Sequence, residues 1–498
     1  MMFFMSHAPV LAIIIPLMGA PICALFRGKT APWLFTLILS ALSFAYSIDL
    51  LIEVSANGPI SYEIGGWAPP YGIEYVADPL SAFVMVIISG ISTGVLLYAK
   101  ESIANEVPTS HLGFFFAAYL LALTGMMGIT VTGDAFNIFV FLEITSLSSY
   151  VLIAMGARQD RRALTAAFQY LIIGTIGATF ILIGVGLLYI MTGTLNIADI
   201  ANQFDSISDT RPVRAAVGFL IVGIAIKIAM FPFHAWLPNA YSYAPNIVTA
   251  FFAGTATKVS VYLLIRFIYT IFGADFSFGT VYLTELLLPL GVIAALSMSV
   301  VAIFQDNLKR LLAFSSVAQL GYITIAIALA TEAGLTAGIL HIFNHAIVKT
   351  GLFLSVGAMF YATGTTSIKS LAGVGQRMPI TSFGFVLGGL GLIGVPLTPG
   401  FISKWYLIQA VLERGDYIGY GLAIAILLSS IFAVIYIWRV VEILYFQPTP
   451  EGATGGEAPL SLIIPCWIFI LGSFYFGIET SINVGFSEQA AQFLMGAR

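Results

Sequence analysis

Long apolar stretches alternate along this chain with short segments that hold most of its polar residues. A helix needs about 20 mostly apolar residues to cross the hydrocarbon core of a bilayer. The pattern predicts fourteen such helices, at 8–26, 31–53, 79–99, 111–131, 134–156, 163–192, 213–231 with a broken continuation to about 244, 247–271, 281–303, 309–330, 334–362, 381–411, 417–446 and 459–480. We therefore expect an all-α polytopic membrane protein.

Composition supports this assignment. Of the 498 residues, 59% are hydrophobic and 9% are charged, whereas soluble domains carry about 25% charged residues. The net charge of -4 gives no basic surface for nucleic acid. The N-terminus lacks the positive segment and cleavage site of a signal peptide, so we predict that residues 8–26 form the first span.

No motif points to a cofactor or a metal. The two cysteines, Cys23 and Cys466, offer no Cys-x-x-Cys pair for zinc or an iron–sulfur cluster. Residues 389–394 match G-x-G-x-x-G, but they lie in an apolar span without a preceding strand, which favours helix packing. Residues 28–30 resemble the end of a P-loop, but cysteine occupies the required upstream glycine position.

Basic residues in the loops predict the orientation, because loops rich in Lys and Arg stay inside. With the N-terminus outside, the inside loops hold Arg27, Lys29, Lys100, Arg158, Arg161, Arg162, Lys309, Arg310, Lys369 and Arg377. The outside segments hold only Arg211, Arg214, Arg414 and Arg498. The acidic loop at 53–78 would then lie outside, and the segment 158–162 inside.

One interrupted stretch combines two features of an ion path. Lys227 lies deep in an apolar run, and Pro232 removes a backbone donor five residues later. A broken helix in a bilayer is tolerated only where it is buried in protein or lines a watery cavity, and an intramembrane lysine suggests function. Span twelve has the same combination, with Lys404 after Pro396 and Pro399. Five spans separate the two interruptions, as expected of inverted repeats in a transporter.

Further ionisable residues lie at similar depth. Glu143 is nine residues from Asp134, hence about 13 Å into the membrane, and Lys258 and Lys349 are central in their spans. Each charge costs about 2.5–3.5 kcal/mol to insert, and burial disfavours the charged form of both residue types, which eases proton exchange. We expect Glu143 and Lys227 to be the closest acid–base pair of the first repeat. Structural ion pairs between helices are the alternative.

His341, His345 and Lys349 follow one another at i, i+4 and i+8, so a helix places them on one face about 6 Å apart. Histidine titrates near neutrality, so this face predicts a proton path that continues to Lys404 and leaves toward the outer side. Two histidines bonded across the bundle, or a haem site, are alternatives. For Lys404 the alternative is that its side chain extends to the surface.

Taken together, several motifs resemble the antiporter-like subunits shared by respiratory complex I and the Mrp Na+/H+ antiporters. The resemblance rests on residues 139–143 with 148–150, 227–238, Lys258, 305–316, 341–349 and 399–404. The loop 66–73 and the chain length are most similar to the D-type chain of Mrp complexes. The resemblance implies fourteen spans, arranged as an N-terminal three-helix segment (1–110), two inverted five-helix repeats (111–272 and 281–446) with helices 7 and 12 broken, and a C-terminal helix and tail (447–498). It also implies a proton route through Glu143, Lys227, Lys258, His341, His345, Lys349 and Lys404.

These observations predict a proton-translocating subunit of a monovalent cation (Na+)/H+ antiporter, a secondary transporter and not an enzyme. It would act in pH homeostasis in the prokaryotic cell membrane, with membrane partners like the A, B, C, E, F and G components of Mrp, and without a cofactor, a metal or nucleic acid. The alternative is a proton-pumping subunit of a redox-driven complex, such as a complex I-like NADH-quinone oxidoreductase or a membrane-bound hydrogenase. Five buried ionisable groups argue against a purely structural scaffold.

Overall fold

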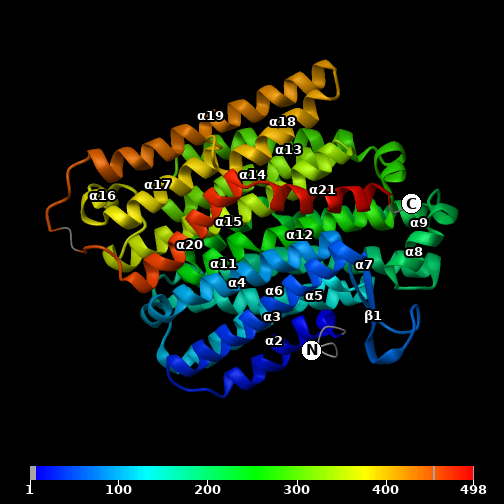
Figure 1. Ribbon diagram of the computed structural model, residues 1–498, viewed down its shortest axis with the longest axis horizontal. Helices are drawn as coiled ribbons and strands as arrows, with labels where there is room; N and C mark the ends of the chain where they lie inside the picture. Colours follow the sequence, from blue (N-terminus) through cyan, green and yellow to red (C-terminus); the bar gives the residue numbers. More distant parts are fainter. Residues whose placement is uncertain (1–6, 453–454, 497–498) are drawn as a thin grey trace.

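The computed structural model describes residues 7–452 and 455–496, which form a bundle of helices lying side by side (Figure 1). The helices are α2 (Ala8–Ala24), α3 (Thr30–Asn57), α4 (Pro79–Glu106), α5 (Leu112–Val131), α6 (Ala135–Ala154), α7 (Arg162–Thr192), α8 (Ile197–Ile207), α9 (Arg211–Ile228), α10 (Trp236–Tyr243), α11 (Asn246–Gly254), α12 (Ala256–Ile265), α13 (Leu283–Ile303), α14 (Leu308–Ala328), α15 (Glu332–Thr363), α16 (Val374–Arg377), α17 (Pro379–Ile393), α18 (Pro399–Leu412), α19 (Tyr417–Phe446), α20 (Leu460–Ile478) and α21 (Ser481–Gly496). Arg498, one of the four basic residues assigned to the outside, lies outside the described residues.

Among the described residues, twelve helical segments are long and apolar enough to cross a membrane, and α2 and α17 are shorter apolar helices. The prediction of a helical polytopic membrane protein is therefore confirmed, but the protein is nearly all-helical and not all-α, because the described residues include one two-stranded sheet. Central helices such as α14 are buried almost all round, whereas α3, α7 and α19 bury only one face. Such helices at the periphery of the bundle expose apolar side chains to lipid or to other membrane subunits.

Many helix starts follow from local sequence. Seven described helices begin at a residue whose side chain accepts a hydrogen bond from the first turn, namely Asp78, Asp134, Asn196, Asn307, Thr331, Thr398 and Asp416. The first-turn N–H groups of a helix have no intrahelical partner, so such caps satisfy them where water is scarce. At Asp78 the cap is a full capping box with Ser81, followed by a proline at the first helical position.

Two predicted spans are interrupted where prolines occur. The first comprises α9 and α10, separated by residues 229–235, and the second comprises α17 and α18, separated by residues 394–398. A third interruption, at Thr255 between α11 and α12, has no proline and was not predicted. Predicted span 247–271 is therefore two α-helices followed by a π-helical turn at Arg266–Ile271, and a second π-helical turn covers Asp275–Thr280.

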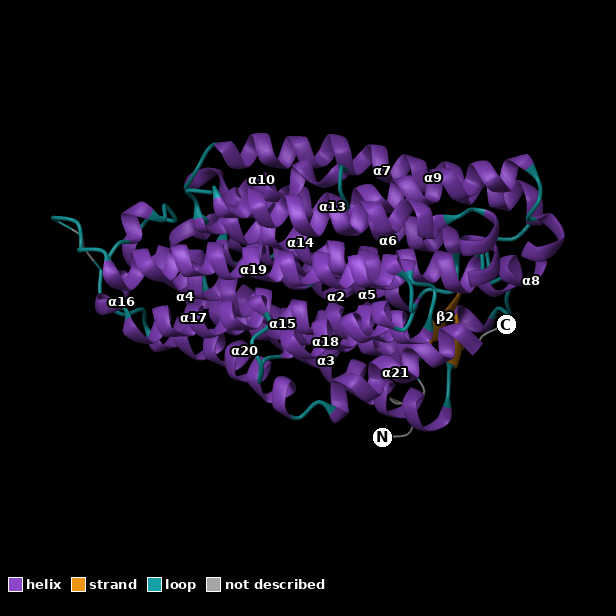
Figure 2. Cartoon of the chain, turned by 90° about the horizontal axis from the view of Figure 1, so that it is seen from above, coloured by secondary structure: helices purple, strands orange, loops and turns teal. Residues whose placement is uncertain are grey.

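The end of the bundle predicted to lie outside carries structure that apolar periodicity did not reveal. Strands β1 (Ile60–Glu63) and β2 (Glu74–Ala77) pair antiparallel, with Ile60 opposite Ala77. They lie at the same end of the molecule as α8 and the C-terminal end of the chain (Figure 2). The tail after the last span is the helix α21, which packs on α15 and α4. Short 3-10 turns cover Ile64–Gly66, Thr109–His111, Met155–Arg158, Phe233–Ala235 and Lys369–Leu371.

Candidate functional site

Lys227 is buried in the last turn of α9, immediately before the first interruption. Its Nζ donates to Ser146 Oγ of α6 at 2.7 Å. The interruption begins at Ala229, which has a left-handed backbone (φ 60°), and the indole N–H of Trp236 donates across it to the carbonyl of Ile226 at 3.1 Å. Lys227 thus lies beside the end of α9, where the indole of Trp236 binds a carbonyl that has no partner in a continuous helix.

Glu143 lies on α6, one turn before Ser146, and its side chain is only half-buried. No ion pair within 4.0 Å joins it to any described residue, although Glu143 and Lys227 interact electrostatically at longer range. The expectation that they form the closest acid–base pair of the first repeat is wrong, because Arg162 and Asp160 approach to 2.6 Å at the surface. The prediction placed the Glu143 carboxylate beside the ammonium group of Lys227, but the hydroxyl of Ser146 lies there instead.

Lys258 is completely buried and also lies beside a helix interruption. It is three residues after Thr255, and its Nζ donates to the carbonyl of Ala253, at the end of α11. A break frees carbonyls from helical hydrogen bonds, so the ammonium group satisfies an acceptor that the break exposes. Lys258 also interacts electrostatically with His345 and Lys349 of α15, which places it between the two halves of the chain.

The predicted face of α15 is present. The rings of His341 and His345 lie parallel with centroids 5.9 Å apart. Lys349, also completely buried, donates to the carbonyl of Leu312 at 2.8 Å and to the hydroxyl of Ser315, both on α14. The helix spacing read from the sequence therefore brings two imidazoles and an ammonium group into one row in the middle of the bundle.

Lys404 lies in α18, after the second interruption, and is buried. Its Nζ donates to the carbonyls of Leu392 at 3.2 Å and Ile393 at 2.7 Å, the end of α17, and to Ser430 Oγ at 3.0 Å. The ammonium group also lies 5.1 Å from the ring centroid of Tyr322. The surface location weighed as the alternative for Lys404 does not apply, because the carbonyl end of α17 binds its charge.

The second interruption contacts the histidine face directly. His341 Nδ1 and Ser403 Oγ share a hydrogen bond of 2.8 Å, and Asn344 Nδ2 donates to the carbonyl of Pro399 at 2.7 Å. Tyr322 stands edge-on to His341, with ring centroids 5.7 Å apart. Lys404, Tyr322, His341 and His345 thus form one continuous cluster of polar side chains.

Three ring nitrogens in this cluster are buried without a hydrogen-bond partner in the described chain: His341 Nε2 and both nitrogens of His345. Buried polar groups are ordinarily bonded to protein or to ordered water. No carboxylate of the described residues contributes to the cluster, so its titratable side chains are lysines, histidines and the phenol of Tyr322. Such an arrangement can pass protons among basic groups through intervening hydroxyls and water.

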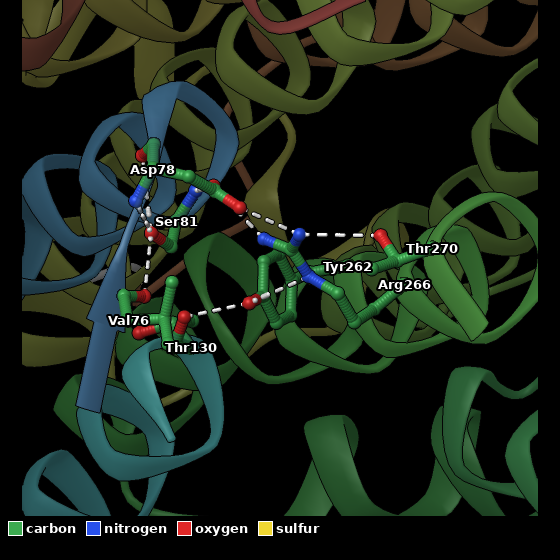
Figure 3. A network of polar contacts seen from close by, with 7 residues as sticks. All are labelled: Val76, Asp78, Ser81, Thr130, Tyr262, Arg266 and Thr270. Carbon is green, nitrogen blue, oxygen red and sulfur yellow. Dashed lines mark hydrogen bonds and ion pairs between the residues drawn. The ribbon is translucent and has the colours of Figure 1, made fainter. Parts of the chain in front are cut away.

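A second buried network has every partner in place (Figure 3). Asp78 and Arg266 form an ion pair of 2.6 Å, and the same guanidinium donates to Tyr262 Oη at 3.1 Å and Thr270 Oγ1 at 3.3 Å. Tyr262 in turn donates to the carbonyl of Thr130 at 2.6 Å. These contacts join the start of α4 with α5, α12 and the π-helical turn. Because each charge of the buried pair has a partner, we interpret the network as a structural link between these helices.

Two hydroxyl partners of the buried bases were not predicted, Ser146 beside Lys227 and Ser403 beside His341. Ser315, which Lys349 contacts, belongs to the 305–316 motif, and its sequence position left open whether it hydrates the path or joins helices. Lys309, counted among the inside loops, is buried in the first turn of α14 and donates to the carbonyl of Ala244 at 3.0 Å. A lysine two residues after a capping asparagine indicates a position inside the helix, since the helix that Asn307 caps begins at Leu308.

Sequence comparison places this arrangement among known proteins. Residues 132–431 match the family described as NADH:quinone oxidoreductase/Mrp antiporter, TM. The chain is 39% identical over 492 residues to NADH-quinone oxidoreductase subunit N of Desulforudis audaxviator, covering 95% of this chain and 96% of that protein. It is 32% identical over 395 residues to the D component of the Na(+)/H(+) antiporter of Alkalihalophilus pseudofirmus, covering 79% and 78%, and 28% identical over 497 residues to that of Bacillus subtilis, covering 99% and 98%.

Solved structures agree with the sequence relatives. A chain of the membrane-bound sulfane sulfur reductase, an archaeal respiratory membrane complex, superposes with a TM-score of 0.89 at 31% identity, covering 98% of both chains. A chain of the Mrp complex from Dietzia sp. superposes with the same TM-score at 25% identity, covering 99% of this chain and 98% of that one. The chain therefore belongs to the NADH:quinone oxidoreductase/Mrp antiporter transmembrane family.

Proposed function

We propose that this chain is the proton-translocating membrane subunit of a multisubunit Na+/H+ antiporter, equivalent to the D component of the Mrp complexes. One observation carries the proposal: the buried row formed by Lys258, His345, His341 and Lys404, with unpartnered ring nitrogens between lysines at helix interruptions. The relatives named as D components of Na(+)/H(+) antiporters and the Mrp complex structure support it. The chain is then a secondary transporter subunit and not an enzyme.

The proposed route begins at Glu143 and Lys227 and continues through Lys258 to the α15 face and Lys404. Because Lys227 donates to Ser146, one turn after Glu143 on α6, we assign to this hydroxyl the step between the first acid and the first base. From Lys404 the route leads outward along α18 to Glu413, about 13 Å away on the helix rise. A cavity of about 590 Å³, lined by Glu332, Glu413 and Glu488, lies at that end.

A second function is favoured by a specific observation. The identity with the protein named NADH-quinone oxidoreductase subunit N, at 39%, is higher than with the two antiporter components compared above. The same proton route would then serve a redox-driven pump, with electrons handled by other subunits. Both functions assign the same roles to the same side chains of this chain and differ only in its partners.

We further propose that the twelve long spans and the apolar helices α2 and α17 together give fourteen crossings, with the N-terminus outside. In this arrangement residues 111–272 and 281–446 are inverted repeats, and residues 1–110 and 447–498 flank them. The two proline interruptions, each beside a buried lysine, support the repeat assignment. A reporter enzyme fused near Gln159 that is active outside the cell would contradict this orientation.

Purification of the native complex tests the function directly. Copurification with small membrane subunits alone, together with Na+-dependent proton movement in vesicles, is the expected result. Partners that carry iron–sulfur clusters or bind quinone would establish the redox-driven alternative instead. The broken helices and the lone intramembrane carboxylate of the proposed route, Glu143, form a half-path that needs partner subunits to couple to a second ion, so we expect the isolated chain to insert in vesicles without exchanging Na+ for protons. Exchange at the rate of native membranes by this chain alone would refute the need for partners.

A further inference from the structure

A polar cavity of about 330 Å³ opens at the end of the bundle opposite the β-hairpin. Its walls come from the end of α4, the turn before α7, the α10–α11 connection, the start of α14 and the loop after α15. The segments that contribute Asp160, Arg162 and Lys309 to it are those predicted to face inside. The route proposed above does not include this cavity.

Two buried ionisable side chains stand at the cavity wall. Glu106, the last residue of α4, is 4% exposed, and Lys309 of α14 is 5% exposed. The carboxylate of Glu106 accepts from Asn246 N and from Ser102 Oγ, each at 2.8 Å. The two charges do not form a direct ion pair but interact electrostatically. Each thus remains available to a further partner or to water from the cavity.

From Lys309 the helix α14 leads inward to the proposed route. Leu312 is one turn further along, and Ser315 about 9 Å further at 1.5 Å per residue. The carbonyl of the first and the hydroxyl of the second are the two groups that Lys349 contacts. One helix therefore carries the cavity-lining lysine at its start and both partners of Lys349 within its next two turns.

We propose that Glu106 and Lys309 form the inner proton entrance, collecting protons from this cavity and passing them along α14 to Lys349. The proposal rests on the proton-translocating function inferred above and adds an aqueous end on the inner side, which the route lacked. Among the described residues, no carboxylate contributes to the cluster of His341, His345 and Lys404. The proposed entrance adds one, Glu106, to the route that leads to this cluster.

Asp160, at the cavity rim, does not fill this role. The Arg162 side chain hydrogen-bonds its carboxylate and holds the pKa of Asp160 below its ordinary value. Asp160 therefore stays charged when Glu106 would accept a proton. A purely structural role for Glu106 is the competing explanation. Its carboxylate accepts a hydrogen bond from Asn246 N, and Lys309 donates one to the carbonyl of Ala244, so the two side chains together hold the α10–α11 connection.

Two substitutions separate proton uptake from structural support. Glu106→Gln keeps an acceptor for Asn246 N but carries no proton, so proton entry predicts that exchange falls about 100-fold. Glu106→Asp keeps the carboxyl group but shortens the side chain. A role in proton entry therefore predicts more exchange with Asp than with Gln. A purely structural role predicts the reverse, because the longer Gln side chain still reaches Asn246 N. Glu101→Gln, on the same helix but paired with Lys29 at the surface, is the matched control and should exchange normally.

Exchange is measured in inverted membrane vesicles that contain the whole complex, alongside Lys227→Ala. Loss in Lys227→Ala with normal exchange in Glu106→Gln leaves the function standing and overturns the entrance. Normal exchange in Lys227→Ala overturns the function, and the entrance with it. An order in which Asp is worse than Gln also overturns the entrance.

A thiol in the cavity gives an independent test that leaves Glu106 in place. Both natural cysteines of this chain are buried, so Thr366→Cys adds an accessible thiol at the cavity wall. A charged methanethiosulfonate reagent added from the inner side should label it and stop exchange, whereas the unlabelled variant exchanges normally. Absence of labelling, or labelling without loss of exchange, would overturn the proposal.

Discussion

The two proline interruptions place the same residue type, a buried lysine, in two different electrostatic settings. Lys227 precedes its break, contacts one hydroxyl and has a carboxylate, Glu143, at longer range. Lys404 follows its break, binds two carbonyls and a hydroxyl, and has only an aromatic ring and a histidine cluster around it among the described residues. An acid balances one ammonium group, and the negative end of a helix balances the other.

The backbones at the two breaks differ as well. The left-handed position that ends α9 is occupied by alanine, Ala229, at φ 60°, and the one that ends α17 is occupied by Gly394, at φ 90°. Glycine adopts this conformation freely, whereas alanine costs about 1–2 kcal/mol there. The second break has its own left-handed non-glycine residue, Leu397 at φ 74°, so each break holds one strained backbone position. The two breaks differ in where that position lies: it ends α9 in the first, whereas in the second it comes three residues after the glycine that ends α17.

The largest effect is expected from the first lysine. Lys227→Ala removes the buried ammonium group and should lower cation/proton exchange about 100-fold or more, while the complex still assembles. Glu143→Gln should be similarly defective, because the longer-range charge partner of Lys227 is lost. Exchange in membrane vesicles, with assembly followed by copurification, measures both. Normal transport by Lys227→Ala would remove the first break from the route.

The second lysine is tested by Lys404→Arg. Arginine keeps the positive charge that the α17 carbonyls bind, but it does not release a proton in proteins. A relay role predicts that Lys404→Arg is as defective as Lys404→Ala, about 100-fold below the parent. If the charge only caps α17, the arginine variant transports normally, and Lys404 then has no part in proton transfer.

A smaller effect is expected from Gly394→Ala. The substitution costs about 1–2 kcal/mol in the left-handed conformation, and the added Cβ would lie 3.0 Å from Cδ of Lys404. We expect a lower Tm of the purified complex and partial loss of exchange. Gly186→Ala, where an added Cβ meets no atom within 4 Å, is the control. Unchanged exchange and Tm in Gly394→Ala would show that the second break does not depend on this geometry.

The smallest effect is expected from Ala229→Gly. Glycine relieves about 1–2 kcal/mol of backbone strain but loses about 0.4–1 kcal/mol through its greater freedom in the unfolded chain. The net result should be a small rise in Tm, with exchange retained. A fall in Tm would mean that the methyl group of Ala229, which is fully buried, contributes more through packing than its backbone costs.

The helices and two breaks were predictable because apolar length and proline act locally. The row on α15 was predictable for the same reason, since spacing within one helix fixes a face. Partners on other helices were not: Ser146 and Ser403 contact their bases only through packing of distant segments. The break at Thr255 contains no proline that would have marked it in the sequence. The helix α21 was not predicted because its apolar stretch is too short for a membrane span. Each missed feature depends on tertiary contact.

The network around Arg266 affects where protons can pass, because a protein that moves protons must keep them from leaving its route. Lys258, Tyr262 and Arg266 recur at i, i+4 and i+8, so α12 and its π-helical turn lead from the middle of the bundle toward the β-hairpin end. The guanidinium in that line stays charged, and a cavity of about 130 Å³ lined by Asp78, Tyr262 and Arg266 lies beside it. A fixed cation raises the energy of any further positive charge beside it. The helix that presents Lys258 to the proposed route therefore carries a fixed positive charge toward the β-hairpin end, which disfavours the passage of a proton through that cavity.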